Sequence, residues 1–133
     1  MPEASSPLPI SIVREVRDTC QCLAAQRRAR LLARRFDAVF QPLNINNGQF
    51  SLLVALAAPK PWRMGPLAEL LAMDRTTLTS LLVTLKRRKL VKMMPDKTDK
   101  RARLVTLSAA GSAVVAKAVP LWREEHEKVA REI

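Results

Sequence analysis

The chain of 133 residues has no tyrosine, one histidine, two cysteines and three glycines. Its longest apolar run, LLVALAA at 52–58, is far shorter than the roughly 20 residues that a membrane-spanning helix needs. The N-terminal MPEASSPLP has neither a basic start nor an apolar core, so no signal peptide is predicted. We therefore expect a cytoplasmic protein with no membrane partner.

The groups that carry enzyme chemistry are also scarce. There is no P-loop and no glycine-rich dinucleotide loop, and His126 has no second His or Cys three or four residues away, which argues against a closed metal site. The five aromatic residues are scattered, which argues against a stacking platform for single-stranded nucleic acid. They are Phe36, Phe40, Phe50, Trp62 and Trp122. We predict no enzyme activity, no cofactor and no metal.

Acidic residues are nearly missing from one stretch of an otherwise balanced chain. Residues 75–103 contain ten Lys and Arg against only Asp96 and Asp99, and so carry +8 of the net charge of +11. The segment 109–133 is neutral. A basic segment in a chain whose charges are otherwise nearly balanced is typical of nucleic-acid binding, although a merely soluble basic surface would look similar.

The first half of the chain predicts one long helix. Residues 1–10, rich in Pro and Ser, are expected to form a flexible arm. From 11 to about 40 there is no Gly or Pro, and apolar residues recur at helical spacing, so we predict one helix over 11–42, with Ser11 as its N-cap and Pro42 ending it. A helix this long cannot bury itself in so small a domain, and part of it is expected to pack on a second subunit.

Three capping signals mark the helices that follow. Asn46 and Gln49 have the spacing of a capping box. Pro66 stands in the first turn of a short helix, where its missing N–H costs nothing. Asp74 is the predicted N-cap of the helix RTTLTSLLVTLKRRK. Two short helices joined by a tight turn indicate a helix-turn-helix.

The helix after Asp74 has two contrasting faces. Leu78, Leu81, Leu82 and Leu85 form one apolar stripe. The opposite face has hydroxyls and cations and no acid, so it can approach phosphates and base edges without repulsion. Its members are Arg75, Thr76, Thr77, Thr79, Ser80, Thr84 and Arg87. The alternative is an amphipathic helix that happens to lack Glu.

The remaining sequence predicts a basic hairpin and a final helix. LVKMM and RLVTLS are predicted strands, and PDKTDKRA between them is too long for a tight turn, so a basic tip projects. Ser108 caps a helix over 109–133 that Pro120 is expected to bend. The predicted fold is mainly α with a small β-hairpin, in which a winged helix-turn-helix region at 44–108 lies between two flanking helices, 11–42 and 109–133.

Three stretches resemble the MarR family of winged-helix regulators. They are QFSLLVAL at 49–56, LAELLAMDRTTLTSLLVTLKRRKLV at 67–91, and DKTDKRARLVTLSAAG at 96–111. The resemblance implies a homodimer, paired through its first and last helices, that binds a palindromic double-stranded DNA operator and usually represses. It also implies release by an oxidative signal or by a small aromatic or carboxylic effector. The pattern is still helical at Ile133, where the family's last helix often continues.

The resemblance also assigns roles to single residues. It places Arg75, Thr76, Thr77, Thr79 and Ser80 in the major groove. It assigns Arg101 to the minor groove, with Asp99 orienting it, and Lys97, Lys100 and Arg103 are expected to contact phosphates. Lys89 stands where the family usually has Gly. A left-handed helix end at this position would cost a lysine roughly 1 kcal/mol.

Cys20 and Cys22 are candidate redox residues, because some family members sense hydroperoxides with a cysteine in the first helix. The tyrosines that hydrogen-bond that thiolate in the family are missing here, although Arg14, Arg17 and Arg27 could supply positive charge. Positions i and i+2 point to nearly opposite sides of a helix, so a disulfide between the two within a helix is unfavourable. The alternative is that Cys20 lies in the core and that Cys22 is a small residue without a function.

A second function is compatible with the same fold. The chain could be a winged-helix module for protein interaction or non-specific nucleic-acid binding, without operator specificity. The hydroxyls on the acid-free face argue against it, because a purely electrostatic surface does not need them.

Overall fold

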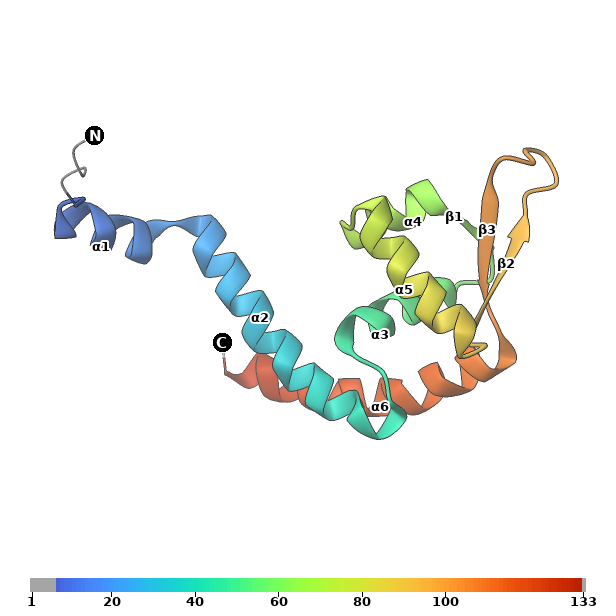
Figure 1. The fold of residues 1–133 in the computed structure, drawn as a ribbon. Helices are drawn as coiled ribbons and strands as arrows, with labels where there is room; N and C mark the ends of the chain where they lie inside the picture. The colour runs from blue at the N-terminus through green and yellow to red at the C-terminus, as the bar shows by residue number, and fades with distance from the viewer. Residues whose placement is uncertain (1–6, 133) are drawn as a thin grey trace. The chain divides into compact units, whose positions relative to one another are not determined.

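The structure is a computed structural model that describes residues 7–132 (Figure 1). Residues 1–6 of the predicted arm, and Ile133, lie outside the described residues. The chain divides into two compact units, residues 1–35 and 36–133.

The predicted single helix over 11–42 is wrong, because two helices occupy this region. They are α1 (Ile10–Thr19) and α2 (Gln21–Phe40), separated at Cys20, whose φ of −68° and ψ of 111° are extended. Asp18, Thr19 and Cys20 all have low helix propensity, and the Thr19 hydroxyl bonds back to the carbonyl of Glu15 at 2.5 Å. Residue Pro9, not Ser11, precedes the first turn of α1, without a side-chain cap.

The second unit begins with the end of α2 and contains the other helices. Pro42 lies in the short 3-10 helix η1 (Gln41–Leu43), which agrees with the predicted end of the preceding helix. The capping box is confirmed: the amide of Gln49 donates to Asn46 Oδ1 at 2.8 Å, and the amide of Asn46 donates to Gln49 Oε1 at 2.9 Å. The helices are α3 (Asn47–Leu56), α4 (Met64–Leu71), α5 (Arg75–Arg87) and α6 (Ala109–Arg131).

The predicted hairpin is confirmed, and the sheet is larger than expected. Strands β2 (Val91–Pro95) and β3 (Arg103–Leu107) pair antiparallel. On the other side of β3 lies β1 (Trp62–Arg63), a segment whose sequence suggests a loop, so the order is β1-β3-β2. A strand of two residues has no alternating pattern to detect. The Trp62 indole N–H donates to the carbonyl of Ala55 at 3.0 Å and attaches β1 to α3.

One apolar core joins the helices to the sheet. Leu78, Leu82 and Leu85 of α5 are buried, and Leu81 packs at the core's edge, as the stripe predicts. The other fully buried large side chains are Phe40, Leu52, Leu53, Leu67 and Val105. The apolar side of α5 is therefore anchored in the core, and its polar face is exposed.

The last helix is capped as predicted. The amide of Gly111 donates to Ser108 Oγ at 3.0 Å, and α6 runs through Pro120 without interruption. Among residues 7–132, no helix is long and apolar enough to cross a membrane.

Candidate nucleic-acid interface

The turn between α4 and α5 is three residues long and tightly bonded. Ala72 has a left-handed φ of 52°, and the amide of Met73 donates to the carbonyl of Ala68 at 2.9 Å. The amide of Thr77 donates to Asp74 Oδ1 at 2.7 Å, which confirms Asp74 as the N-cap of α5. This bond, with one from the Thr77 hydroxyl, lowers the pKa of Asp74. The helix-turn-helix prediction is confirmed.

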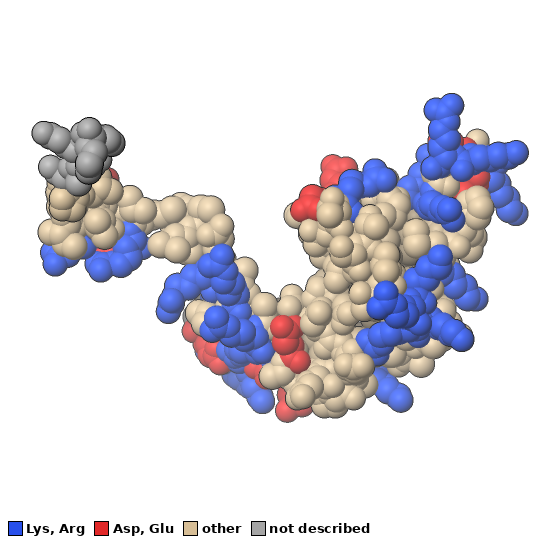
Figure 2. All heavy atoms as spheres, in the orientation of Figure 1, with Lys and Arg blue, Asp and Glu red and all other residues tan. Residues whose placement is uncertain are grey.

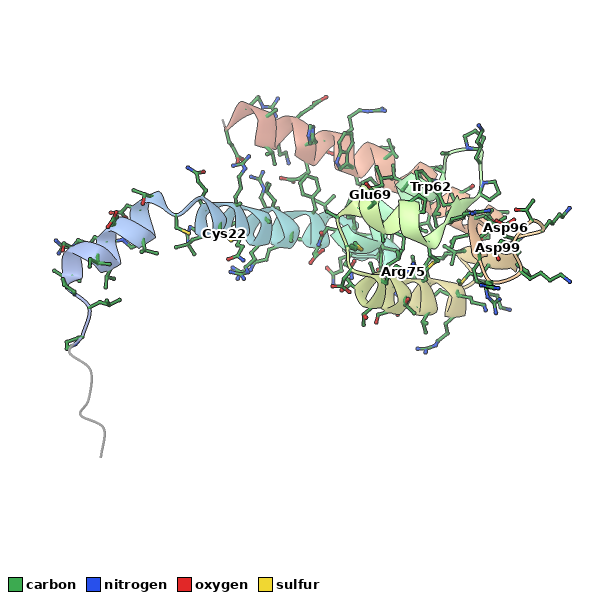
Figure 3. The ribbon with its side chains drawn as sticks, turned by 90° about the horizontal axis from the view of Figure 1, so that it is seen from above. Cys22, Trp62, Glu69, Arg75, Asp96 and Asp99 are labelled. Atoms are coloured by element: carbon green, nitrogen blue, oxygen red, sulfur yellow. The ribbon has the colours of Figure 1, made fainter. Side chains whose placement is uncertain are left out.

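All seven polar residues predicted on α5 are exposed, including Arg75 at its start (Figure 3). Two of their hydroxyls are already bonded locally: Thr77 Oγ1 donates to Asp74 Oδ2 at 3.1 Å, and Thr84 Oγ1 donates to the carbonyl of Ser80 at 3.3 Å. The Ser80 hydroxyl has no such bond within the part of the chain that is described. Ser80 is therefore better placed than Thr77 or Thr84 to contact a base.

The wing is the loop between β2 and β3, and its base is held by a buried carboxylate that the sequence pattern did not single out. Asp96 is only 7% exposed. Its Oδ1 accepts from the amide and the hydroxyl of Thr98, both at 2.9 Å, and its Oδ2 lies 2.5 Å from Nη2 of Arg63 in β1. The Thr98 bonds first, and then the Arg63 charge, lower the pKa of Asp96.

Of the two contacts of Asp96, the one with Thr98 could have been predicted from the sequence. An Asp whose side chain bonds the backbone two residues later forms an Asx-turn, so the D-x-T of residues 96–98 was a usable signal. Arg63 gives no such signal, because it lies 33 positions away and its strand was not recognised.

Asp99 contacts Arg101 through the backbone. Its Oδ1 accepts from the amide of Arg101 at 3.0 Å, while the Arg101 guanidinium is exposed and makes no ion pair with any residue from 7 to 132. The other predicted wing residues, Lys97, Lys100 and Arg103, are exposed as well. Figure 2 shows lysine and arginine side chains gathered around the wing and α5.

Lys89 adopts the conformation for which a glycine is favoured. Its φ is 62°, its amide donates to the carbonyl of Lys86 at 2.9 Å, and the amide of Leu90 donates to the carbonyl of Leu85 at 3.0 Å. These two bonds define a Schellman motif at the end of α5. The carbonyl of Lys89 accepts from Ser108 Oγ at 2.7 Å, so this strained residue also connects α5 to the start of α6.

The two cysteines lie at the break between α1 and α2. Cys20 is half-exposed and its Sγ accepts from the amide of Leu23 at 3.4 Å, whereas Cys22 is exposed, and both are free thiols. Cys20 is therefore not core. Since Cys20 is extended, the argument against a Cys20–Cys22 disulfide, which assumed a continuous helix, no longer holds.

His126 stacks on Trp122 of the same helix, with 4.5 Å between the ring centroids. No group of three or more potential metal ligands lies together among the described residues.

An apolar cavity of about 460 Å³ lies between α3, α4 and α6. No charged side chain lines it, and Ser51 supplies its one side-chain hydroxyl. The lining residues are Phe50, Ser51, Val54, Ala55, Leu70, Leu71, Val119 and Trp122.

Comparison with solved structures identifies the family. The transcriptional regulator MosR of M. tuberculosis, crystallised with DNA, is 35% identical, with a TM-score of 0.80 and coverage of 86% of this chain and 83% of MosR. The chain belongs to the MarR family. MarR itself, a C80S mutant from E. coli with operator DNA, shares the fold at 23% identity and a TM-score of 0.79, covering 96% of this chain and 88% of that one.

A relative found by sequence similarity agrees with this MarR-family assignment. The HTH-type transcriptional repressor NicR of Pseudomonas putida is 31% identical over 97 residues, which are 70% of this chain. The match spans 61% of the length of NicR. No protein-family model matches the sequence. The predicted fold class and family resemblance are confirmed, with the third strand added.

Proposed function

We propose that the chain is a homodimeric, sequence-specific regulator that binds double-stranded DNA and acts as a repressor. The observation that carries this proposal is the exposed, acid-free face of α5, together with a wing whose base is fixed by a buried carboxylate. Relatives named as a transcriptional regulator and a transcriptional repressor support it. A cytoplasmic location and the absence of enzyme activity belong to the same proposal.

The dimer is proposed to form through 11–42 and 109–133. In α1 no residue is buried, although Ile10, Ile12, Val13 and Val16 are apolar and exposed. Apolar residues gathered on one short helix favour burial against another surface, and a second copy of this chain is the proposed occupant. Two recognition helices would then enter successive major grooves of a palindrome, about 34–36 Å apart.

The release signal is proposed to be a small apolar molecule in the cavity between α3, α4 and α6. Its volume of about 460 Å³ is within the usual range for ligand sites. Because no cation lines it, an uncharged aromatic ligand fits better than a carboxylate, whose burial would be unfavourable. Binding would shift the population between two dimer shapes that differ in DNA affinity. Oxidation of Cys20 or Cys22 is the competing signal.

Binding-site selection from random duplexes tests the proposed function. We expect enrichment of a palindrome whose half-sites lie one helical turn apart. If no sequence is enriched while binding persists, the chain is a non-specific or protein-interaction module instead. Titrating the selected complex with neutral aromatics, aromatic carboxylates and peroxide, with a C20S/C22S variant as control, then separates the signals.

A further inference from the structure

A second basic surface lies on α2, on residues other than those assigned to the recognition helix and wing. Between Gln21 and Phe36 there are five arginines and no acid. Arg27, Arg30 and Arg34 recur at i, i+3 and i+7, so they share one side of the helix within about 60° of arc. We call these three residues the arginine row. Figure 2 shows basic side chains, in blue, gathered in the region of this helix, which is light blue in Figure 1.

The arginine row is exposed. The nearest acid along the helix is Asp37, one turn after Arg34, and Asp37 Oδ1 accepts hydrogen bonds from Asn47. None of its three members makes an ion pair with any other described residue. Outside α5, whose polar face also lacks acids, charged helical faces of this chain are mixed: Arg17 pairs with Asp18 at 2.8 Å, and Lys128 lies 3.9 Å from Glu124. An ordinary solvated helix face carries both signs, so the row resembles the acid-free face of α5 and differs from α1 and α6.

The row is unfavourable for the isolated helix. Like charges three or four residues apart destabilise a helix by about 0.2–0.5 kcal/mol for each pair. The row contains two such pairs, Arg27 with Arg30 and Arg30 with Arg34. A bound polyanion would offset this repulsion.

The spacing fits a phosphate backbone. Seven residues of α-helix rise about 10 Å. One strand of DNA carries a phosphate for about each 3.4 Å of axis, and its phosphates wind around that axis, so the row is long enough to contact neighbouring phosphates of one strand. Arginine presents a planar fork of donors that suits phosphate oxygens better than the point charge of lysine does.

We propose that the arginine row binds the sugar–phosphate backbone of the DNA to which the regulator is bound. The inference rests on the proposed DNA-binding function and adds a third contact surface to it. Because phosphate contacts carry no base information, the row adds affinity and salt dependence without changing sequence preference.

The test compares two triple variants of the full chain that remove the same charge. R27Q/R30Q/R34Q removes the row, and K60Q/K117Q/R123Q removes three exposed cations elsewhere, two of them on α6, so that the control also changes a helix proposed to form the dimer. Glutamine is a good helix former, so α2 should persist, which circular dichroism checks. Affinity for the selected duplex is measured against salt concentration.

The slope of log affinity against log salt should fall by about 0.9 for each phosphate that is no longer neutralised. If the row neutralises one to three phosphates per chain of the dimer, the expected fall is about 2 to 5, with affinity at least about tenfold weaker at physiological salt. The control should keep nearly the wild-type slope. The ratio of operator to random-duplex affinity should stay unchanged in both variants, and R27K/R30K/R34K should keep the slope.

Equal slopes for the row variant and the control would overturn the proposal. Sedimentation analysis supplies a second check: a row variant that becomes monomeric while the control stays dimeric would assign the arginines to a protein interface, which also overturns it. If the wild-type chain selects no operator, the proposed function fails, but the same slope measured on random duplex still decides whether the row binds phosphate.

Discussion

The carboxylate of Asp96 joins the wing to β1, with 2.5 Å between its Oδ2 and Nη2 of Arg63. Because Asp96 is buried and its other oxygen accepts two bonds from Thr98, both ends of this connection are fixed. The exposed wing residues, Arg101 among them, therefore project from a rigid base. Asp99 adds to this by bonding the amide of Arg101 and leaving its guanidinium outward.

A double-mutant cycle tests this base. Arg101→Ala should weaken operator binding more than tenfold, or about 1.4 kcal/mol, while the dimer stays intact. Arg63→Ala should weaken it by a smaller factor, because a loose wing positions Arg101 poorly. The two effects should be less than additive, whereas Lys60→Ala, an exposed control between α3 and β1, should add nothing. Full additivity of the Arg63 and Arg101 effects would show that Arg63 does not act through the wing.

The pKa of Asp96 gives the wing a pH dependence. Since hydrogen bonds from Thr98 and the charge of Arg63 lower this pKa, the stabilisation is fully present above the ordinary Asp pKa of about 3.9. It should disappear as pH falls through the lower pKa of the folded state. The Thr98 amide resonance should follow that titration in NMR spectra, and the titration should vanish in Asp96→Asn. A Thr98 titration at the ordinary Asp pKa would contradict the proposed contacts.

Ser80 offers a direct test of base reading by α5. Ser80→Ala should lower the operator-to-random affinity ratio by roughly tenfold, on the order of 1 kcal/mol, because its hydroxyl is exposed and makes no hydrogen bond among residues 7–132. Thr84→Ala is the matched control, since the Thr84 hydroxyl is bonded to its own helix. Thr77→Ala should act partly through the cap at Asp74. If Ser80→Ala weakens binding to both duplexes equally, the helix contacts phosphates and not bases.

Much of this architecture follows from local patterns in the sequence. The leucine stripe of α5 and the caps at Asn46, Asp74 and Ser108 depend on neighbours within one or two helical turns, so they could be predicted. The break at Cys20 could not be predicted, because the helical spacing of apolar residues continues through it. The low helix propensity of Asp18, Thr19 and Cys20 outweighed that spacing. The Arg63–Asp96 pair was also missed, because it depends on strand β1 pairing with a strand 40 positions later.

Close packing explains why a glycine stands at position 111, the last residue of the stretch at 96–111 that resembles the family. A Cβ at Gly111 would lie 2.1 Å from the carbonyl oxygen of Leu90 and 2.7 Å from Cδ1 of Leu107. Gly111→Ala should therefore destabilise the fold by about 3 kcal/mol or more, measured by urea unfolding. Gly65→Ala is the control, because its Cβ would meet nothing within 4 Å, and it should be neutral or stabilising. Similar destabilisation at both sites would contradict the close approach at Leu90.

Lys89→Gly should stabilise the chain by up to about 1 kcal/mol, because glycine has no penalty at a φ of 62°. Lys86→Gly, in the last turn of α5 where φ is not positive, is the matched control and should destabilise by up to about 1 kcal/mol. Urea unfolding of both variants gives the comparison. Lower stability in Lys89→Gly would mean that α5 ends differently in solution.

Chemical footprinting on the selected duplex tests the central claim, a dimer that reads two half-sites with α5 and the wing. We predict two major-groove protections one helical turn apart on the same face of the DNA, each accompanied by a minor-groove protection that disappears in Arg101→Ala. A single protected patch, or uniform protection along the duplex, would contradict the account.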